Sequence, residues 1–426
     1  MKIRLLMIAA FLFAAGSASA FEVYNHFLYE RITYPGTAIP EFGPKMQEEV
    51  FDWSDATLVS HSVDFPDLGL KAYGSAEMLL DSSPSNYSTI IPTNQVDFST
   101  KILTAGVSWE IFPGFFAELG KKCIRTGNGY FRSPTDFLGY SNSAISTSST
   151  TAQEKLAEGL IGADLEYLGG FADFHEFFSP WLDWNPTNCP DLQYLQTPQK
   201  NWQNLFTVGF RIFDSDWLAI THTAWDTNGR PLTSFGLNGS ESVGDSLVLY
   251  GAAAIQERVS NTYVSNTTNF ALADREVPWV PSAIAGVTYS LTANDTITVE
   301  YNYNGRGLAG QEYADGIAYM TNRAAQAVIP AGSRNLFGEY GLFNAARHYL
   351  FERYAKNYPD QKASLEVLNL NNLQDGSGMA SLALTWSPDV CNLTARLQTF
   401  YGIPASEVGT AGVLWETSIE AELFVF

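Results

Sequence analysis

The sequence contains little charge. Of its 426 residues, 16% are charged, against about 25% in ordinary soluble domains. Basic residues number 24 against 45 acidic ones, giving a net charge of −21, and they are scattered along the chain. Nucleic-acid binding needs clustered positive charge that neutralises phosphates. The composition therefore argues against a nucleic-acid partner.

Long apolar runs and cysteines are also scarce. Although 46% of the residues are hydrophobic, no stretch after residue 20 approaches the ~18 uncharged apolar residues of a membrane-spanning helix. This rules out a helical membrane protein. The three cysteines, Cys123, Cys189 and Cys391, allow at most one intrachain disulfide, and no two of them have metal-ligand spacing.

Catalytic motifs are missing as well. The chain has no GxSxG, HExxH, P-loop or CxxC sequence. His175 follows Asp173, and His222 lies between two threonines, so either could act as a base. A lone histidine in a strand, however, is far more often an ordinary residue facing the lumen or an interface. We therefore expect no enzyme activity, no cofactor and no metal.

The first twenty residues are typical of a bacterial secretory signal peptide. Lys2 and Arg4 precede an apolar stretch, and Ala18-Ser19-Ala20 forms a cleavage site before Phe21. Cleavage leaves 22 basic against 45 acidic residues, a mature charge of −23. We expect residues 1–20 to be removed and residues 21–426 to form one domain.

The rest of the chain alternates with a period of two. One side of each segment is apolar and the other polar, as in strands with one oily and one wet face. In the second segment Leu103, Val107 and Trp109 share the apolar side. The clearest segments are 68–80, 103–111, 297–303 and 393–401.

Strand length separates two fold classes. Alternation continues for about 9 to 13 residues, whereas strands of soluble proteins usually have ~5 to 6 and tilted membrane strands need ~9 to 11. The lengths favour an all-β, transmembrane antiparallel β-barrel over a soluble sandwich or propeller.

The end of the chain resembles the C-terminal signature of Gram-negative outer-membrane barrels, in which an aromatic residue ends the last strand. Here the terminal residue is Phe426, after an alternating segment from Gly412. Ala421 and Ile419 stand where that signature has glycine and a polar residue. The resemblance implies export to the outer membrane and recognition of Phe426 by the barrel-assembly machinery.

Turn residues predict the strand number. Eight short connections and nine longer ones give eighteen strands, with sixteen as the alternative, and an even number puts both termini in the periplasm. The short connections are expected at 66–67, 113–114, 169–170, 215, 242–244, 293–294, 359–360 and 388–389. The longer ones are expected at 34–51, 81–100, 126–158, 179–201, 226–229, 257–281, 305–345, 372–377 and 402–411.

Residues 120–137 stand out because four basic residues lie close together in an acidic chain. Gly127-Asn128-Gly129 and Pro134-Thr135-Asp136 can each turn the backbone sharply. The run resembles a segment of outer-membrane porins related to the alginate-export group, as do residues 300–308, 347–350 and 375–378. The resemblance implies a porin-like barrel and leaves the substrate open.

An inward-folded loop would place some of these basic groups opposite carboxylates of the barrel wall. Such a constriction would select among ions, as rings of charged side chains do. The alternative puts the basic groups at the outer rim, against lipopolysaccharide; Lys121 fits the rim better. The constriction candidates are Lys122, Arg125, Arg132 and Arg396 with Glu110, Glu118, Asp164, Glu166 and Glu300.

Together these features predict an outer-membrane, porin-type channel for small hydrophilic solutes, with a lumen narrowed by inward-folded loops. Its expected partners are outer-membrane lipid, lipopolysaccharide and the solutes themselves. Two alternatives remain open. One is a channel for hydrophobic, fatty-acid-like substrates, and the other is a surface structural or adhesive barrel whose exposed loops, such as 141–151, are the functional part.

Overall fold

The computed structural model describes residues 21–33, 49–85, 93–138, 153, 155–157, 159–180, 202–225, 229–266, 271–325, 343–403, 405–408 and 415–425. Residues 1–20 and Phe426, with their predicted roles, lie outside the described residues. The strands are β1(Phe21–Thr33), β2(Glu49–Phe65), β3(Leu70–Ser85), β4(Thr93–Phe112), β5(Phe115–Lys122), β6(Leu160–Leu168), β7(Ala172–Ser179), β8(Gln203–Ile212), β9(Ser215–Trp225), β10(Pro231–Val243), β11(Leu247–Asn266), β12(Ala271–Thr292), β13(Asp295–Tyr303), β14(His348–Tyr358), β15(Ala363–Asn372), β16(Gly378–Trp386), β17(Cys391–Tyr401) and β18(Trp415–Val425).

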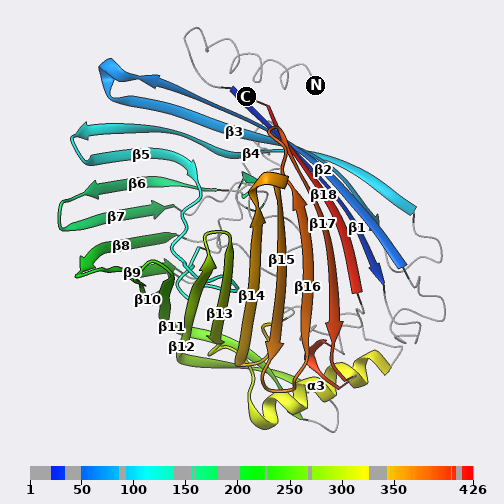
Figure 1. The fold of residues 1–426 in the computed structure, drawn as a ribbon. Coiled ribbons are helices and arrows are strands. Elements are labelled where there is room, and N and C mark those ends of the chain that lie inside the picture. The colour runs from blue at the N-terminus through cyan, green and yellow to red at the C-terminus, as the bar shows by residue number, and fades with distance from the viewer. Residues whose placement is uncertain are drawn as a thin grey trace.

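The strands form one closed antiparallel barrel. Each strand pairs with its neighbours in sequence, and β1 pairs with both β2 and β18, which joins the two ends of the sheet. Figure 1 shows this ring of strands, with the red β18 beside the blue β1. The predicted number of eighteen strands is confirmed.

The two ends of the barrel differ. At one, the turn end, eight short connections join the strands, at 66–69, 113–114, 169–171, 213–214, 244–246, 293–294, 359–362 and 387–390. Pro66 and Pro359 each begin a single 3-10 turn, closed by Gly69 and Lys362 in the left-handed conformation. Two predicted turns are displaced by one or two residues, because Ser215 begins β9 and Val243 ends β10. The opposite end is called the loop end.

The predicted bounds of two loops are wrong. Residues 81–100 were expected to be a long loop, but β3 continues to Ser85 and β4 begins at Thr93. Residues 257–281 are mostly strand as well, because β11 and β12 are 20 and 22 residues long. Polar residues in both stretches resemble loop composition, yet cross-strand pairing along most of the described residues keeps them extended.

Side chains alternate between the inner wall and the outer face. On β13, Ile297 and Tyr301 are exposed outside, whereas Thr298 and Glu300 are buried inside. The alternation predicted for 297–303 is confirmed. Where the first and last strands meet, Phe424 of β18 lies on the inner wall with Tyr24 of β1, and their ring centroids are 5.4 Å apart.

A β-bulge corrects the predicted facing of Leu103. Consecutive residues of β3 pair with Thr104 and then with Ile102 of β4, so Leu103 is left as an extra residue without a partner in the register. An extra residue reverses the alternation, so Leu103 is 1% exposed and packs inside with Tyr24 and Leu58.

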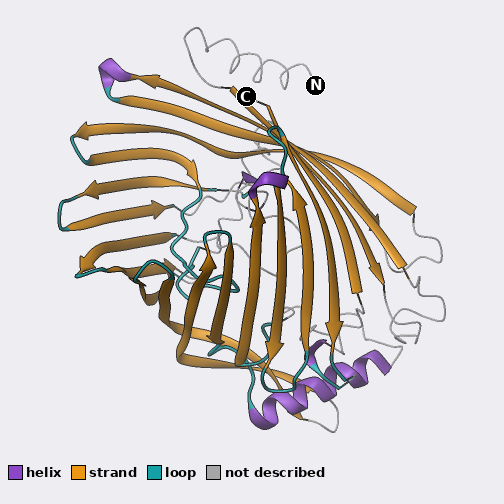
Figure 2. Ribbon diagram, viewed as in Figure 1, coloured by secondary structure: helices purple, strands orange, loops and turns teal. Residues whose placement is uncertain are grey.

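Helix α3(Gly310–Ala325) lies at the loop end, where Figures 1 and 2 place it across the ends of the strands. Its buried face, including Tyr313, Ile317 and Met320, packs in the largest apolar cluster with side chains of β14 and β15. No helix among the described residues is long and apolar enough to cross a membrane.

Candidate functional site: the barrel interior

The chain between β5 and β6 enters the barrel. Residues 123–138, here named the inward segment, contact the inner wall of strands far away in sequence. Thr135 Oγ1 donates to Asn238 Oδ1 of β10 at 2.6 Å, and Asn238 Nδ2 donates to the Thr126 carbonyl. Phe137 stacks on His222 of β9, with ring centroids 5.5 Å apart. His222 is therefore a packing residue of this wall.

Glu300 anchors the tip of the inward segment. Its carboxylate, fully buried on β13, accepts the backbone N–H groups of Tyr130 at 2.9 Å and Phe131 at 3.2 Å. It also accepts the Tyr250 hydroxyl at 3.0 Å. The sequence suggested that Glu300 faces basic side chains, whereas the structure pairs it with backbone amides of the loop.

The glycines at the tip permit this close approach. A Cβ on Gly129 would lie 2.6 Å from the Arg132 carbonyl oxygen and 2.8 Å from Ile284 Cδ1 on β12. A Cβ on Gly127 would lie 2.1 Å from Ser133 Cβ. The Gly-Asn-Gly sequence thus lets the segment fold back on itself directly against the wall.

Both predicted loop arginines lie on the inward segment. The Arg132 guanidinium lies 5.5 Å from the centroid of the Phe131 ring, and its backbone carbonyl accepts Asn302 Nδ2 at 3.4 Å. Burial lowers the pKa of Arg132, against the opposing attraction of Tyr349 and Glu407. Arg125 is half-buried near the start of the segment.

A charged network on β3, β5, β6 and β7 unites three predicted residues. Lys122 lies 3.3 Å from Glu118 and pairs with Asp164. Two pairings were not predicted: His175, named above only as a candidate base, pairs with Asp164, and the Tyr73 hydroxyl donates to Glu118. The sequence signal that could have indicated them is that Tyr73 and His175 lie on the polar side of their alternating strands.

The other predicted residues lie apart from this network. Lys121, expected at the rim, is buried at 2% exposure. Glu110 and Glu166 are exposed, each opposite Phe116 in the register near the turn end. Arg396 of β17 lies 3.9 Å from Glu366, which also accepts Arg353 Nε at 2.7 Å. Neither Arg353 nor Glu366 was singled out from the sequence.

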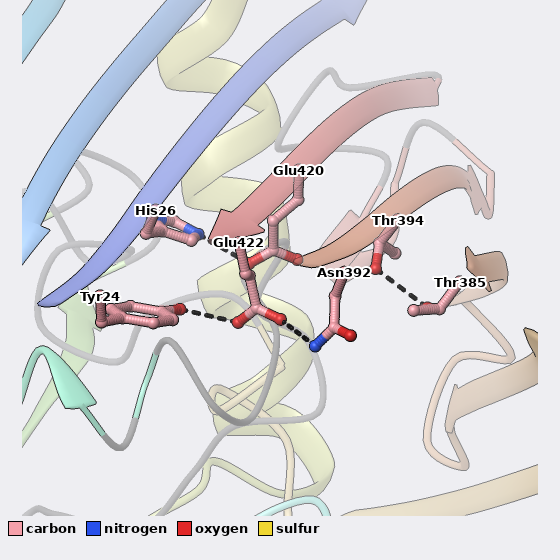
Figure 3. Close-up of polar contacts among 7 residues, drawn as sticks. All are labelled: Tyr24, His26, Thr385, Asn392, Thr394, Glu420 and Glu422. Carbon is pink, nitrogen blue, oxygen red and sulfur yellow. Dashed lines mark hydrogen bonds and ion pairs between the residues drawn. The ribbon is translucent and has the colours of Figure 1, made fainter. Parts of the chain in front are cut away.

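An acidic stretch of wall was also missed. Glu420 and Glu422 of β18 are buried on the inner wall, where His26 lies 2.6 Å from Glu420 and Tyr24 donates to Glu422 at 2.7 Å. Figure 3 shows these contacts with Asn392, which donates to Glu422 at 2.8 Å. The signal in the sequence was that all three glutamates of the last strand, at positions 416, 420 and 422, fall on the same side of its alternation.

The connection between β5 and β6 also touches this opposite wall. Lys155 lies 3.8 Å from Glu22 and 5.3 Å from the centroid of the Tyr24 ring. The Gly159 N–H donates to the Leu103 carbonyl at the bulge, at 2.9 Å. One connection thus contacts β9–β13 on one side and β1 and β4 on the other, which narrows the interior.

A second set of contacts joins the loops at the loop end. Glu407, fully buried between β17 and β18, accepts the N–H groups of Asn344 at 3.0 Å and Ala345 at 2.9 Å. Asn372 Nδ2 donates to the same carboxylate at 2.8 Å. Tyr313 of α3 donates to Asp375 at 2.6 Å, which links the helix to this cluster.

Among the described residues no group of three or more His, Cys, Asp or Glu side chains could hold a metal ion. The interior instead offers hydrogen-bonding and charged groups along a wall, with a loop across it. Such an arrangement can select solutes by size and charge.

No protein-family model and no curated protein matches the chain. Solved structures do. OccAB1 of Acinetobacter baumannii is 11% identical, with a TM-score of 0.57 over 96% of each chain. OccK9 (OpdG) of Pseudomonas aeruginosa is 9% identical, with a TM-score of 0.54 over 96% of this chain and 98% of its own. A mutant of the Rh. blastica porin is 10% identical, with a TM-score of 0.46 over 96% of this chain and 100% of its own. The chain thus has the closed barrel fold of the Occ structures along nearly its whole length.

Proposed function

We propose that the protein is an outer-membrane, porin-type channel for small hydrophilic solutes. The observation that carries the proposal is the inward segment, which crosses the interior of a closed barrel and is fixed to its wall by Glu300 and Asn238. A narrowed, polar interior suits selection among solutes in water.

The outer face supports a membrane location. Large apolar side chains are exposed all around the barrel, among them Val107 at 47%, Leu119 at 67% and Leu397 at 47%. A lipid-facing apolar band of this kind is what a barrel needs in a bilayer. In this proposal the turn end faces the periplasm, lipopolysaccharide surrounds the loop end, and the assembly machinery recognises the C-terminal strand.

The relationship to the alginate-export porins is part of the same proposal. It rests on the motifs of the inward segment and of residues 300–308, and these two segments meet at Glu300. No substrate follows from it.

Planar-bilayer recording of the purified, detergent-solubilised protein tests the function. We expect discrete single-channel steps in potassium chloride. A heat-denatured sample of the same preparation serves as control. Correctly folded protein that inserts and conducts no ions would contradict the proposal.

A further inference from the structure

Tyr130 presents a fixed aromatic ring inside the barrel. Its backbone is held by Glu300, and its ring meets Tyr250 edge-on at 5.9 Å and lies parallel to Phe351 at 6.4 Å between centroids. Even so, 40% of the residue remains exposed. An aromatic ring that is held in place and partly open is ready to stack on a ligand, because no side-chain freedom is lost on binding.

A charged pair lies beside this ring. The Arg353 guanidinium is 5.7 Å from the Tyr130 ring centroid, and its Nε donates to Glu366 Oε2 at 2.7 Å. Both side chains keep about a quarter of their surface exposed, 26% for Arg353 and 28% for Glu366. Together they offer several N–H donors and carboxylate acceptors next to one aromatic face.

From this juxtaposition we infer that Tyr130, Arg353 and Glu366 form a binding site for a neutral polyhydroxylated ring, such as a saccharide, within the lumen. The C–H face of a sugar ring stacks on an aromatic ring, while its vicinal hydroxyls donate to a carboxylate and accept from a guanidinium. The inference rests on the proposed channel function and names its solute class.

The charges favour a neutral ligand over the alternatives. Glu366 neutralises Arg353, and Arg396, only 9% exposed and 3.9 Å from Glu366, is also attracted by Glu416, so the group offers little net positive charge to an anion. A cation would meet the two guanidiniums. A hydrocarbon chain would remove the exposed charged groups from water without satisfying them.

The experiment measures block of the ion current by maltotriose in planar bilayers with the intact protein. We expect a saturable block in the wild type and a half-blocking concentration about tenfold higher in Tyr130→Ala, as for the loss of one stacked ring. Tyr130→Phe keeps the ring and should retain the block. Tyr167→Ala is the matched control, since Tyr167 is also 40% exposed but lies on the outer face.

The outcomes separate the two proposals. Absence of any ion current in folded wild-type protein contradicts the channel function itself. Normal ion current without block by maltotriose, or a block that Tyr130→Ala leaves unchanged, overturns the saccharide site alone. Stronger block by gluconate or by choline than by maltotriose would likewise overturn it, in favour of a charged ligand.

Discussion

A single buried carboxylate has a large structural role in this barrel. Glu300 accepts two consecutive N–H groups of the inward segment and one hydroxyl, and it is fully buried. Removing it leaves those donors unsatisfied, at a cost of about 1–3 kcal/mol for each buried group. We therefore expect the segment to detach from the wall in Glu300→Ala.

The measurable result is a larger and noisier single-channel conductance in Glu300→Ala than in the wild type. Glu300→Gln retains one acceptor oxygen and should change conductance less. Glu166→Ala, at an exposed carboxylate outside the segment's contacts, is the control. Unchanged conductance in Glu300→Ala would show that Glu300 does not set the opening.

The two loop arginines should oppose the cation preference of an acidic protein. The whole chain has a net charge of −21, which favours cations in the lumen. The double variant Arg125→Gln, Arg132→Gln removes two opposing positive charges, so it should raise cation selectivity and leave folding largely intact. The reversal potential in a salt gradient measures it. The effect should shrink from ~0.1 M to ~1 M salt, as the Debye length falls from ~10 Å to ~3 Å. No change at low salt would place both side chains away from the ion path.

At the scale of elements, the alternation of side chains sets which substitutions the membrane tolerates. Leu165 of β6 is 43% exposed on the outer face, while its neighbour Glu166 belongs to the inner wall. We expect Leu165→Arg to impair assembly, by about 2–4 kcal/mol if it lies near the bilayer midplane, and Glu166→Arg to be tolerated. Gel migration before and after heating shows how much of each variant has assembled into a folded barrel. Equal tolerance would contradict the assignment of the faces.

The same alternation explains what sequence could and could not reveal. Turn residues and period-two patterns predicted the eighteen strands, because each is a local property of the chain. The bulge at Leu103 was not predictable, since an extra residue appears only when two strands pair. The site was predicted in part: Lys122, Glu118 and Asp164 meet across strands. Tyr130 with Arg353 was missed, because more than two hundred residues separate them in sequence.

The loop cluster around Glu407 should respond to pH. Burial raises the pKa of this carboxyl to about 7, from 4.5, and the charge of Asp375 acts in the same direction. The N–H groups of Ala345 and Asn344 and the Tyr349 hydroxyl oppose this rise, and Arg132 also faces the carboxyl. The folded cluster therefore holds the proton more tightly than the open chain does. Its stability is highest below 4.5 and falls as the pH rises toward about 7.

Limited proteolysis of the detergent-solubilised protein can measure this effect. We expect faster cleavage of the loop end at about pH 8 than at about pH 5, with the difference reduced in Glu407→Gln. Glu312→Gln removes an ion pair between Glu312 of α3 and Arg275 of β12, away from Glu407, and should keep the wild-type response. Equal cleavage at both pH values in the wild type would contradict the role of Glu407.

For the whole molecule, the closed ring of strands predicts bulk behaviour. The mature chain should begin at Phe21, fractionate with outer membranes and migrate faster on gels before heating than after, because a closed barrel resists detergent unfolding. N-terminal sequencing and fractionation of cells test this. Recovery in the soluble periplasmic fraction would contradict the membrane location.

The position of Glu407 in the chain bears on the order in which the barrel is completed. Helix α3 is held by Asn372 and Asp375, which follow it in sequence, and Glu407 lies between the last two strands. The loop end therefore reaches its final form only after β17 exists, close to the moment when β18 pairs with β1. The contacts of Glu407 need every residue of the chain up to position 407, and closure of the ring needs β18, so we expect the loop end to be completed late, together with the barrel itself.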